Sequence, residues 1–199
     1  MRAVRVAAVV LAAGASRRLG RAKQSVEIGG ETLLERAVRV AVEARLEPVI
    51  VVVREEEVGK LLRGCDVVEN ALADEGMASS IRVGVARAEE LGVQGLVVMA
   101  CDQVALRAEH LRALCGEVDR VTGSGYAGKV GIPAYFPAEK FSELMELRGD
   151  VGARELLLGA AVVVDESLGL DVDTEADLAR ARELIGYPPL PPPGSDFGS

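Results

Sequence analysis

The sequence predicts an α/β protein built on a mostly parallel central sheet with a small antiparallel excursion. Short, valine-rich apolar runs alternate with segments rich in Ala, Leu, Glu and Arg, which is the pattern of βαβ units. Hydrophobic residues make up 49% of the chain, but aromatic residues only 3%. The core must therefore be aliphatic, as in sheets that are covered on both faces. A length of 199 residues suits one domain with one core.

The first half of the chain predicts three buried strands and the helices between them. Residues 4–11, 48–53 and 95–100 are nearly continuous apolar runs, typical of parallel strands with both faces covered. Thr32 and Glu35 have the spacing of a capping box at the start of a helix. The other expected elements are a basic loop at 12–23, helices at 32–45, 55–62, 79–91 and 109–117, a short strand at 66–69 and a loop at 70–76.

The pattern changes in the second half. Residues 121–136 are glycine-rich with β character and predict the antiparallel excursion. Residues 123–128 match the pattern Gly-x-Gly-x-x-Gly, but no helix begins there as a dinucleotide site requires, so a flexible loop is expected. Helices are expected at 140–146, 153–158 and 174–185, and a strand at 161–164. Thr174 and Asp177 have the spacing of a capping box at the start of the last helix. Residues 1–186 should form the domain, and the proline-rich residues 187–199 a disordered tail.

The charge distribution favours a small polyanionic ligand. The net charge of −8 argues against nucleic acid as a partner, and no apolar run approaches the roughly 18 residues of a membrane span. The first 26 residues, however, hold six basic residues and no acidic one. This basic segment contains glycines and follows the first strand, so it predicts a local site for a phosphate-bearing ligand.

The cysteines and the histidine exclude several other kinds of chemistry. Cys65, Cys101 and Cys115 are widely spaced and form no CxxC pair, which indicates reduced thiols in a cytoplasmic protein. His110 is the only histidine and falls on a predicted helix. We expect it on the surface, and a catalytic triad based on histidine is not expected.

Ligands of open parallel sheets bind beyond the carboxyl ends of the strands. The segments that should lie there are 12–23, 70–80, 101–104 and 171–174. In the first of them, small residues let backbone N–H groups approach phosphate oxygens, while Arg18 and Lys23 supply positive charge. It is not a Walker A loop, because no Gly-Lys-Ser/Thr follows.

These segments carry a family resemblance. Residues 11–23, LAAGASRRLGRAK, resemble the signature loop of the MobA-like nucleotidyltransferases, L-A-[AG]-G-x-S-x-R-[MF]-G-x-x-K. Within that family the chain is most similar to molybdenum cofactor cytidylyltransferases. The similarity continues, in the same order, at Asn70 to Gly84, Cys101-Asp102-Gln103, Gly131-Ile132-Pro133, 149–154 (GDVGAR) and 171–174 (DVDT). The chain departs from the pattern at Leu19, Val104 and Ile132, and Ile132 stands where His or Asn is common.

The resemblance implies a three-layer, Rossmann-like nucleotidyltransferase fold and a magnesium-dependent reaction. CMP would pass from CTP to the phosphate of molybdopterin cofactor, with release of pyrophosphate. It implies Arg18, Lys23 and Asp102 as catalytic residues, and Asp102 and Asp173 as Mg²⁺ ligands, with Asp171 as an alternative to Asp173. The implied nucleotide-binding residues are Leu11, Ala12, Ala13, Gly14, Arg18, Lys23, Asn70, Ser79, Ser80 and Asp102.

Several alternatives remain open at this stage. Asn70, Ser79 and Ser80 could instead cap the following helix, and Asp150, Gly152 and Arg154 could form either the acceptor side or a tight turn. The Leu-Ala-Ala-Gly sequence favours CTP, since guanylyl members usually carry Leu-Ala-Gly-Gly. The other functions considered are a related transferase with GTP or another phosphorylated acceptor, and a non-catalytic accessory protein that binds the cofactor. A molybdenum hydroxylase, or its chaperone, is the expected protein partner.

Overall fold

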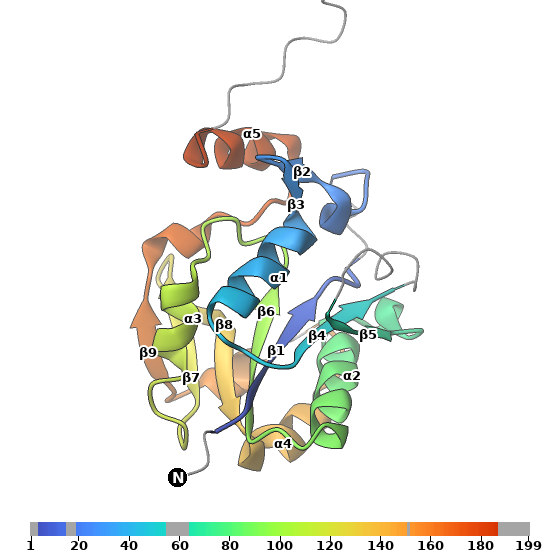
Figure 1. Cartoon of the computed structure of the whole chain (residues 1–199), viewed down its shortest axis with the longest axis vertical. Coiled ribbons are helices and arrows are strands. Elements are labelled where there is room, and N and C mark those ends of the chain that lie inside the picture. Colours follow the sequence, from blue (N-terminus) through green and yellow to red (C-terminus); the bar gives the residue numbers. More distant parts are fainter. Residues whose placement is uncertain (1–3, 15–18, 55–63, 151, 187–199) are drawn as a thin grey trace, which may run out of the picture.

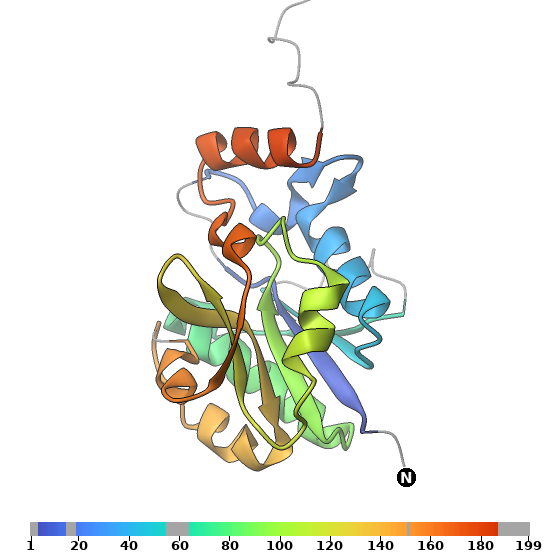
Figure 2. The same ribbon diagram turned by 90° about the vertical axis from the view of Figure 1, so that its left-hand side faces the viewer.

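The computed structural model describes residues 4–14, 19–54, 64–150 and 152–186. They form a seven-stranded sheet with helices on both faces and a separate two-stranded sheet (Figures 1 and 2). The strand order in the large sheet is β5-β4-β1-β6-β8-β7-β9. The α/β class and the mostly parallel sheet predicted from the sequence are confirmed.

Four parallel strands form one half of the large sheet. They are β1 (Val6–Leu11), β4 (Val49–Val53), β5 (Asp66–Glu69) and β6 (Gly95–Ala100). β1 lies between β4 and β6 and is parallel to both. The side chains of β1 and β4 are almost entirely buried, as expected for apolar strands covered on both faces. The chain order reverses at β1, because β4 and β5 lie on one side of it and β6 lies on the other.

The other half of the sheet contains the antiparallel excursion. β7 (Thr122–Tyr126) and β8 (Lys129–Pro137) form a hairpin, and β8 is antiparallel to β6. β9 (Ala161–Val164) forms the edge and is parallel to β7. The prediction of a flexible loop at residues 123–128 is wrong, because most of this segment is the buried strand β7. Glycine is needed here for packing: a Cβ atom at Gly125 would lie 2.7 Å from Val162 Cγ1 of the neighbouring strand.

The helices form the two outer layers. α1 (Leu33–Glu43) and α3 (Ala108–Leu114) pack on one face of the sheet, and α2 (Met77–Glu90) and α4 (Phe141–Met145) pack on the other. α2 lies so close to β1 that a Cβ atom at Gly84 would be 2.3 Å from Val9 Cγ1. Short 3-10 helices lie at Lys23–Ser25, Ala73–Glu75, Ala138–Lys140, Arg154–Leu157 and Glu166–Gly169.

A third group of elements lies beyond the carboxyl end of β1. The small hairpin of β2 (Glu27–Ile28) and β3 (Glu31–Thr32) packs with α5 (Glu175–Leu184) around Ile28, Val172 and Leu178 (Figure 1). Both predicted capping boxes are present, at Thr32 with Glu35 and at Thr174 with Asp177. This group positions two residues on one side of the candidate site, because Lys23 comes shortly before the hairpin and Asp173 shortly before α5.

The expectation that His110 lies on the surface is wrong. Its side chain is buried beneath α3, and Nε2 lies 2.7 Å from Ser124 Oγ of β7. Burial lowers the pKa of His110, with the charge of Asp165 opposing that effect. A polar side chain on the apolar face of α3 is tolerated here because Ser124 provides a hydrogen-bond partner.

Three expectations lie outside the described residues: the helix at 55–62, the role of Arg18 and the tail at 187–199. Among the described residues, none of the helices has both the length and the apolar character needed to cross a bilayer.

Candidate nucleotide site

A cavity of about 430 Å³ lies at the carboxyl ends of β1, β4 and β6. Segments far apart in the sequence contribute to it, from the loop after β1 to Asp173 just before α5. Its position is the one expected for a ligand of an open parallel sheet, next to the strand at which the chain order reverses.

The loop after β1 forms one wall of the cavity. Leu11, Ala12, Ala13 and Gly14 all line it, and the Ala12 amide donates to Val52 O at 2.9 Å. Ala12 and Ala13 are buried, so small side chains bring the backbone directly to the cavity surface. Such a wall lets phosphate oxygens come close to the backbone without steric hindrance from side chains. Arg18, which the sequence places in the same loop, lies outside the described residues.

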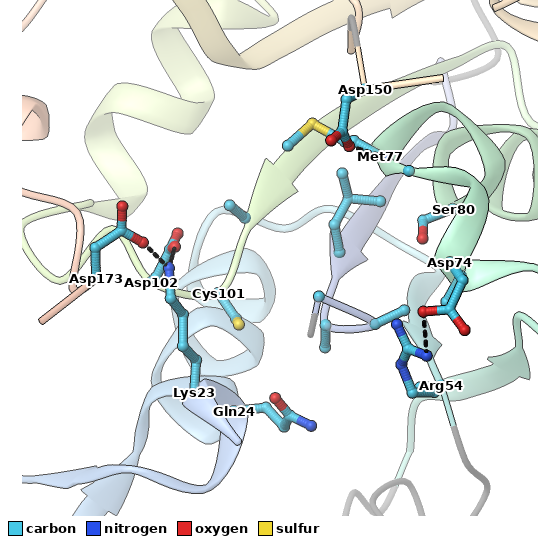
Figure 3. A pocket seen from close by; sticks show the side chains of 17 residues that line it. Lys23, Gln24, Arg54, Asp74, Met77, Ser80, Cys101, Asp102, Asp150 and Asp173 are labelled. Atoms are coloured by element: carbon cyan, nitrogen blue, oxygen red, sulfur yellow. Dashed lines mark hydrogen bonds and ion pairs between the residues drawn. The ribbon is translucent and has the colours of Figure 1, made fainter. Parts of the chain in front are cut away.

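Lys23, Asp102 and Asp173 meet at one side of the cavity (Figure 3). Lys23 Nζ donates to Asp102 Oδ2 at 2.8 Å and also to Asp173 Oδ1. The side chains of Lys23 and Asp102 are each only 18% exposed, and that of Asp173 is 28% exposed. Burial alone would lower the pKa of Lys23, but the two carboxylates outweigh it, and the pKa lies above its usual range. The ammonium is therefore charged at neutral pH.

Backbone contacts hold the two aspartates together. Gln103 and Asp171 form an antiparallel β-bridge, and the Val172 amide donates to Asp102 O at 3.2 Å. Asp102 and Val172, which are 70 positions apart in the sequence, are thus held side by side by main-chain atoms. Asp171 does not line the cavity. Burial first, and then the charge of Asp102, raises the pKa of Asp171 to about 6.

The arrangement of Asp102 and Asp173 fits a divalent cation. Their oxygens already converge on a single positive charge, Lys23 Nζ, and carboxylate oxygens are the donors that Mg²⁺ prefers. Among the described residues no cluster of three or more His, Cys, Asp or Glu side chains could hold a metal ion. Two carboxylates would suffice to hold such a cation where substrate phosphates and water complete its coordination.

Asn70, Ser79 and Ser80 form a buried polar group beside the cavity. Asn70 Nδ2 donates to Ser79 Oγ at 2.8 Å and to Ser80 Oγ at 3.0 Å, while its Oδ1 accepts from the Leu72 amide. Of the three, only Ser80 lines the cavity. Asn70 therefore ties the loop after β5 to the first turn of α2 and positions the Ser80 hydroxyl.

Of the described residues in the segment 149–154, Asp150 reaches the cavity, beside the start of α2. Asp150 lines the cavity and accepts from the Met77 amide at 3.2 Å, and the Ala78 amide donates to Gly149 O at 3.0 Å. These contacts satisfy N–H groups at the start of α2. Arg154 begins a 3-10 helix and is not among the residues that line the cavity.

Several cavity residues were not predicted from the sequence. Arg54 directly follows β4, and its Nη1 donates to Asp74 Oδ1 at 2.9 Å. The rule that ligands bind after strand ends would have found Arg54, since the strand at 48–53 was correctly predicted. Cys101 lies in the segment 101–104 that was expected at this edge and also lines the cavity, but burial and the charge of Asp102 raise the pKa of its thiol to about 12. It is therefore uncharged and a poor nucleophile at neutral pH.

A backbone wall suited to polyphosphate, beside paired carboxylates at the edge of a parallel sheet, is the arrangement of a nucleotidyltransferase. The chain belongs to the family of the MobA-like NTP transferase domain, whose model matches residues 8–163. The family prediction made from the sequence is thereby confirmed.

Related proteins of known name support this assignment. The chain is 31% identical to the purine catabolism protein PucB of Bacillus subtilis, over 90% of this chain and 98% of that protein. It is 36% identical to a probable molybdenum cofactor guanylyltransferase of Opitutus terrae, over 55% of each chain. The chain is also similar to the crystal structure of Rv0371c from Mycobacterium tuberculosis, with a TM-score of 0.77 and a sequence identity of 32%. The match covers 92% of this chain and 100% of that one. A structure of Rv0371c in complex with manganese is also similar, at 30% identity and a TM-score of 0.73 over 91% of this chain and 99% of that one.

Proposed function

We propose that this nucleotidyltransferase transfers CMP from CTP to the phosphate of molybdopterin cofactor, with Mg²⁺ as the metal, and releases pyrophosphate. The observation that carries the proposal is that Asp102 and Asp173 converge on the Lys23 ammonium group. They do so at the edge of a cavity whose wall is formed by Leu11 to Gly14. The Leu-Ala-Ala-Gly sequence of that wall supports CTP as the donor.

The residues of the site suit an in-line displacement at phosphorus. An oxygen of the acceptor phosphate forms a bond to the α-phosphorus of CTP. The bond from that phosphorus to the oxygen bridging the β-phosphate breaks, and pyrophosphate leaves with the electron pair. A phosphate monoester is already largely ionised near pH 7, since its second pKa is about 6, so no general base is needed. This agrees with the burial of His110 against Ser124, away from the cavity.

The chain's own contribution is alignment and neutralisation of charge. Lys23 and Arg18 would bind the triphosphate, and the backbone of Ala12 to Gly14 would approach its oxygens. Asp102 and Asp173 would hold Mg²⁺, which when bound neutralises phosphate charge as the displacement proceeds. Asp173 suits this role better than Asp171, because Asp173 contacts Lys23 and lines the cavity whereas Asp171 does not line it. The manganese complex of the related Rv0371c supports a divalent cation.

The remaining nucleotide contacts follow from the walls of the cavity. Ser80 would contact the nucleoside directly, with Asn70 and Ser79 as the residues that position it. Asp150 would lie on the acceptor side. A molybdenum hydroxylase, or its chaperone, is the proposed recipient of the product, and the cytoplasm is the proposed location. Nucleic acid and membranes are not among the proposed partners.

Two other functions compete with this proposal. The similarity to a probable guanylyltransferase of Opitutus terrae favours GTP as the donor. Ile132, which stands where the family commonly has His or Asn, favours a different phosphorylated acceptor. A non-catalytic protein that only binds the cofactor is the third possibility, which the intact pair of Asp102 and Asp173 disfavours.

One experiment separates these functions. The protein is incubated with Mg²⁺, molybdopterin cofactor and each of the four NTPs in turn, and pyrophosphate is measured. Release with CTP alone is the expected result. Release with GTP alone would change the donor, and release with CTP only when another phosphorylated acceptor replaces the cofactor would change the acceptor. Cofactor binding without turnover of any NTP would establish the accessory protein instead.

A further inference from the structure

Helix α2 begins at the cavity without a capping side chain of its own. Its N-cap residue is Gly76, which has no side chain to accept from the first amides, and the first turn contains no acidic residue. The N–H groups and the partial positive charge at a helix start require an acceptor, preferably an anionic one. Met77 and Ser80 of this first turn line the cavity. The groups that satisfy the helix start therefore also affect the shape of the site.

The segment that follows α4 supplies the missing acceptors. Asp150 Oδ1 accepts from the Met77 amide at 3.2 Å, and Gly149 O accepts from the Ala78 amide at 3.0 Å. Asp150 is 73 residues away from Met77 in the sequence, yet it serves as the cap that Gly76 cannot provide. Figure 3 shows the Asp150 carboxylate next to Met77 at the edge of the cavity.

The two segments are packed closely against each other. Gly76 has a φ of +105°, and a Cβ atom there would lie 2.7 Å from Asp150 Oδ1 and equally close to the carbonyl group of Gly149. Further along α2, Arg82 Nη1 donates to Leu147 O at 2.7 Å. Three contacts from the second half of the chain therefore fix where α2 begins.

The first turn of α2 is also held from the side of the sheet. Asn70 Nδ2 donates to Ser79 Oγ at 2.8 Å and to Ser80 Oγ at 3.0 Å, and Ser79 Oγ donates to Gly76 O at 2.8 Å. Asn70 thus fixes the direction of the Ser80 hydroxyl, whereas Asp150 fixes the position of the turn that carries it.

We propose that Asp150 is a positioning residue for the nucleotide. It holds the first turn of α2 so that the Ser80 hydroxyl meets the nucleotide, and it acts through the helix without contacting either substrate. The inference rests on the proposed function, because it takes Ser80 to contact the nucleoside of CTP. It gives Asp150 a role that differs from both sequence-based alternatives, the acceptor contact and the turn within its own segment.

The test measures CTP binding with Mg²⁺ by titration calorimetry. No acceptor is present, so a residue that acts only on the acceptor would show no effect. Asp150→Asn removes the charge but keeps an oxygen at the capping position, and asparagine caps helices about as well as aspartate. The affinity for CTP should therefore stay within about twofold. Asp150→Glu keeps the charge on a longer side chain, and Asp150→Ala removes the acceptor. Both should weaken CTP binding about fivefold, the value of one hydrogen bond between neutral groups.

A double-mutant cycle tests whether the effect passes through Ser80. Ser80→Ala alone should weaken CTP binding about fivefold. Adding Asp150→Ala to it should cost less than about twofold more, because the hydroxyl that Asp150 positions is then absent. Glu155→Ala is the matched control. Glu155 lies close by in the 3-10 helix Arg154–Leu157, is exposed and does not line the cavity, so its loss should leave CTP affinity within about twofold.

Several results would overturn the inference. Equal losses in Asp150→Asn and Asp150→Ala would show that the charge itself acts on the nucleotide. Unchanged CTP affinity in Asp150→Ala and Asp150→Glu, even at lower thermal stability, would leave Asp150 a structural role only. Unchanged affinity in Ser80→Ala, or an Asp150 effect that persists in full without the hydroxyl, would exclude Ser80 as the intermediary.

The inference stays testable if Asp150→Ala fails to fold, because Asp150→Glu then takes its place in the comparison and in the cycle. Failure of the inference and failure of the proposed function are also distinguishable. Turnover of CTP by the unaltered protein would leave the proposed function standing whatever the variants do. Binding of no NTP by the unaltered protein would overturn both.

Discussion

Replacing Lys23 with methionine should destabilise the protein measurably in the absence of divalent cations. The substitution keeps an unbranched apolar side chain but removes the ammonium that Asp102 and Asp173 share. All three side chains are less than a third exposed, so the interaction lies between an exposed ion pair, worth at most about 1 kcal/mol, and a fully buried one, whose disruption costs about 3–5 kcal/mol. We expect a loss of about 2 kcal/mol. For a domain of this size that corresponds to a fall in Tm of about 4–8 °C.

Urea denaturation with and without Mg²⁺ or Mn²⁺ tests this expectation. Removing the ammonium leaves two adjacent carboxylates and no competing cation from Lys23, so added metal should stabilise Lys23→Met more than the unaltered protein. Arg21→Gln is the matched control. Arg21 belongs to the same loop and pairs with Glu175, but both side chains are more than half exposed, so a change within about 0.5 kcal/mol is expected. Equal stability of Lys23→Met and the unaltered protein without metal, or equal stabilisation of both by metal, would refute the reasoning.

Three further substitutions test other parts of the structure. Asp102→Ala should lower pyrophosphate release at least about 100-fold, the loss typical of a group that stabilises transition-state charge, while circular dichroism stays unchanged; ordinary turnover would remove Asp102 from the mechanism. Gly84→Ala should lower the free energy of unfolding by about 1–2 kcal/mol in urea titrations, because overpacking against the stiff, buried Val9 outweighs the better helix propensity of alanine; a neutral result would show that α2 can move away from β1. His110→Gln should flatten the loss of stability between pH 7 and pH 5. Burial places the pKa of His110 below its ordinary 6.5 in the folded protein, so its contribution is present above about pH 6.5 and is lost as the pH falls through the folded value. Parallel stability curves for the two proteins would contradict this assignment.

Local patterns predicted the elements of this fold well. The buried strands at 48–53 and 95–100 and both capping boxes depend on residues close in sequence, and all are present in the structure. The rule that parallel strands present their carboxyl ends at one edge placed Lys23, Asp102 and Asp173 in one region before their contacts were known. Their roles in binding nucleotide and metal remain predictions.

The features that the sequence did not predict depend on contacts between distant segments. The burial of His110 follows from the position of Ser124, which is set by the pairing of β7 with β8 and β9. The β character of residues 121–136 was predicted, but the flexible loop expected within it at 123–128 was not found, because the glycines of β7 pack closely against valines of β8 and β9. The pairing of Arg54 with Asp74 spans 20 residues and a segment without a recognisable motif. Spacing along the chain carries no information about such contacts.

The backbone bridge between Gln103 and Asp171 has a consequence for how the site can change over evolution. Because main-chain atoms fix the spacing of Asp102 and Asp173, the repulsion between the two carboxylates is overcome once, during folding, and not again at each encounter with a cation. The spacing is also insensitive to which side chains occupy the surrounding positions. Other residues on the walls of the cavity are therefore able to vary while the spacing of the two carboxylates stays the same.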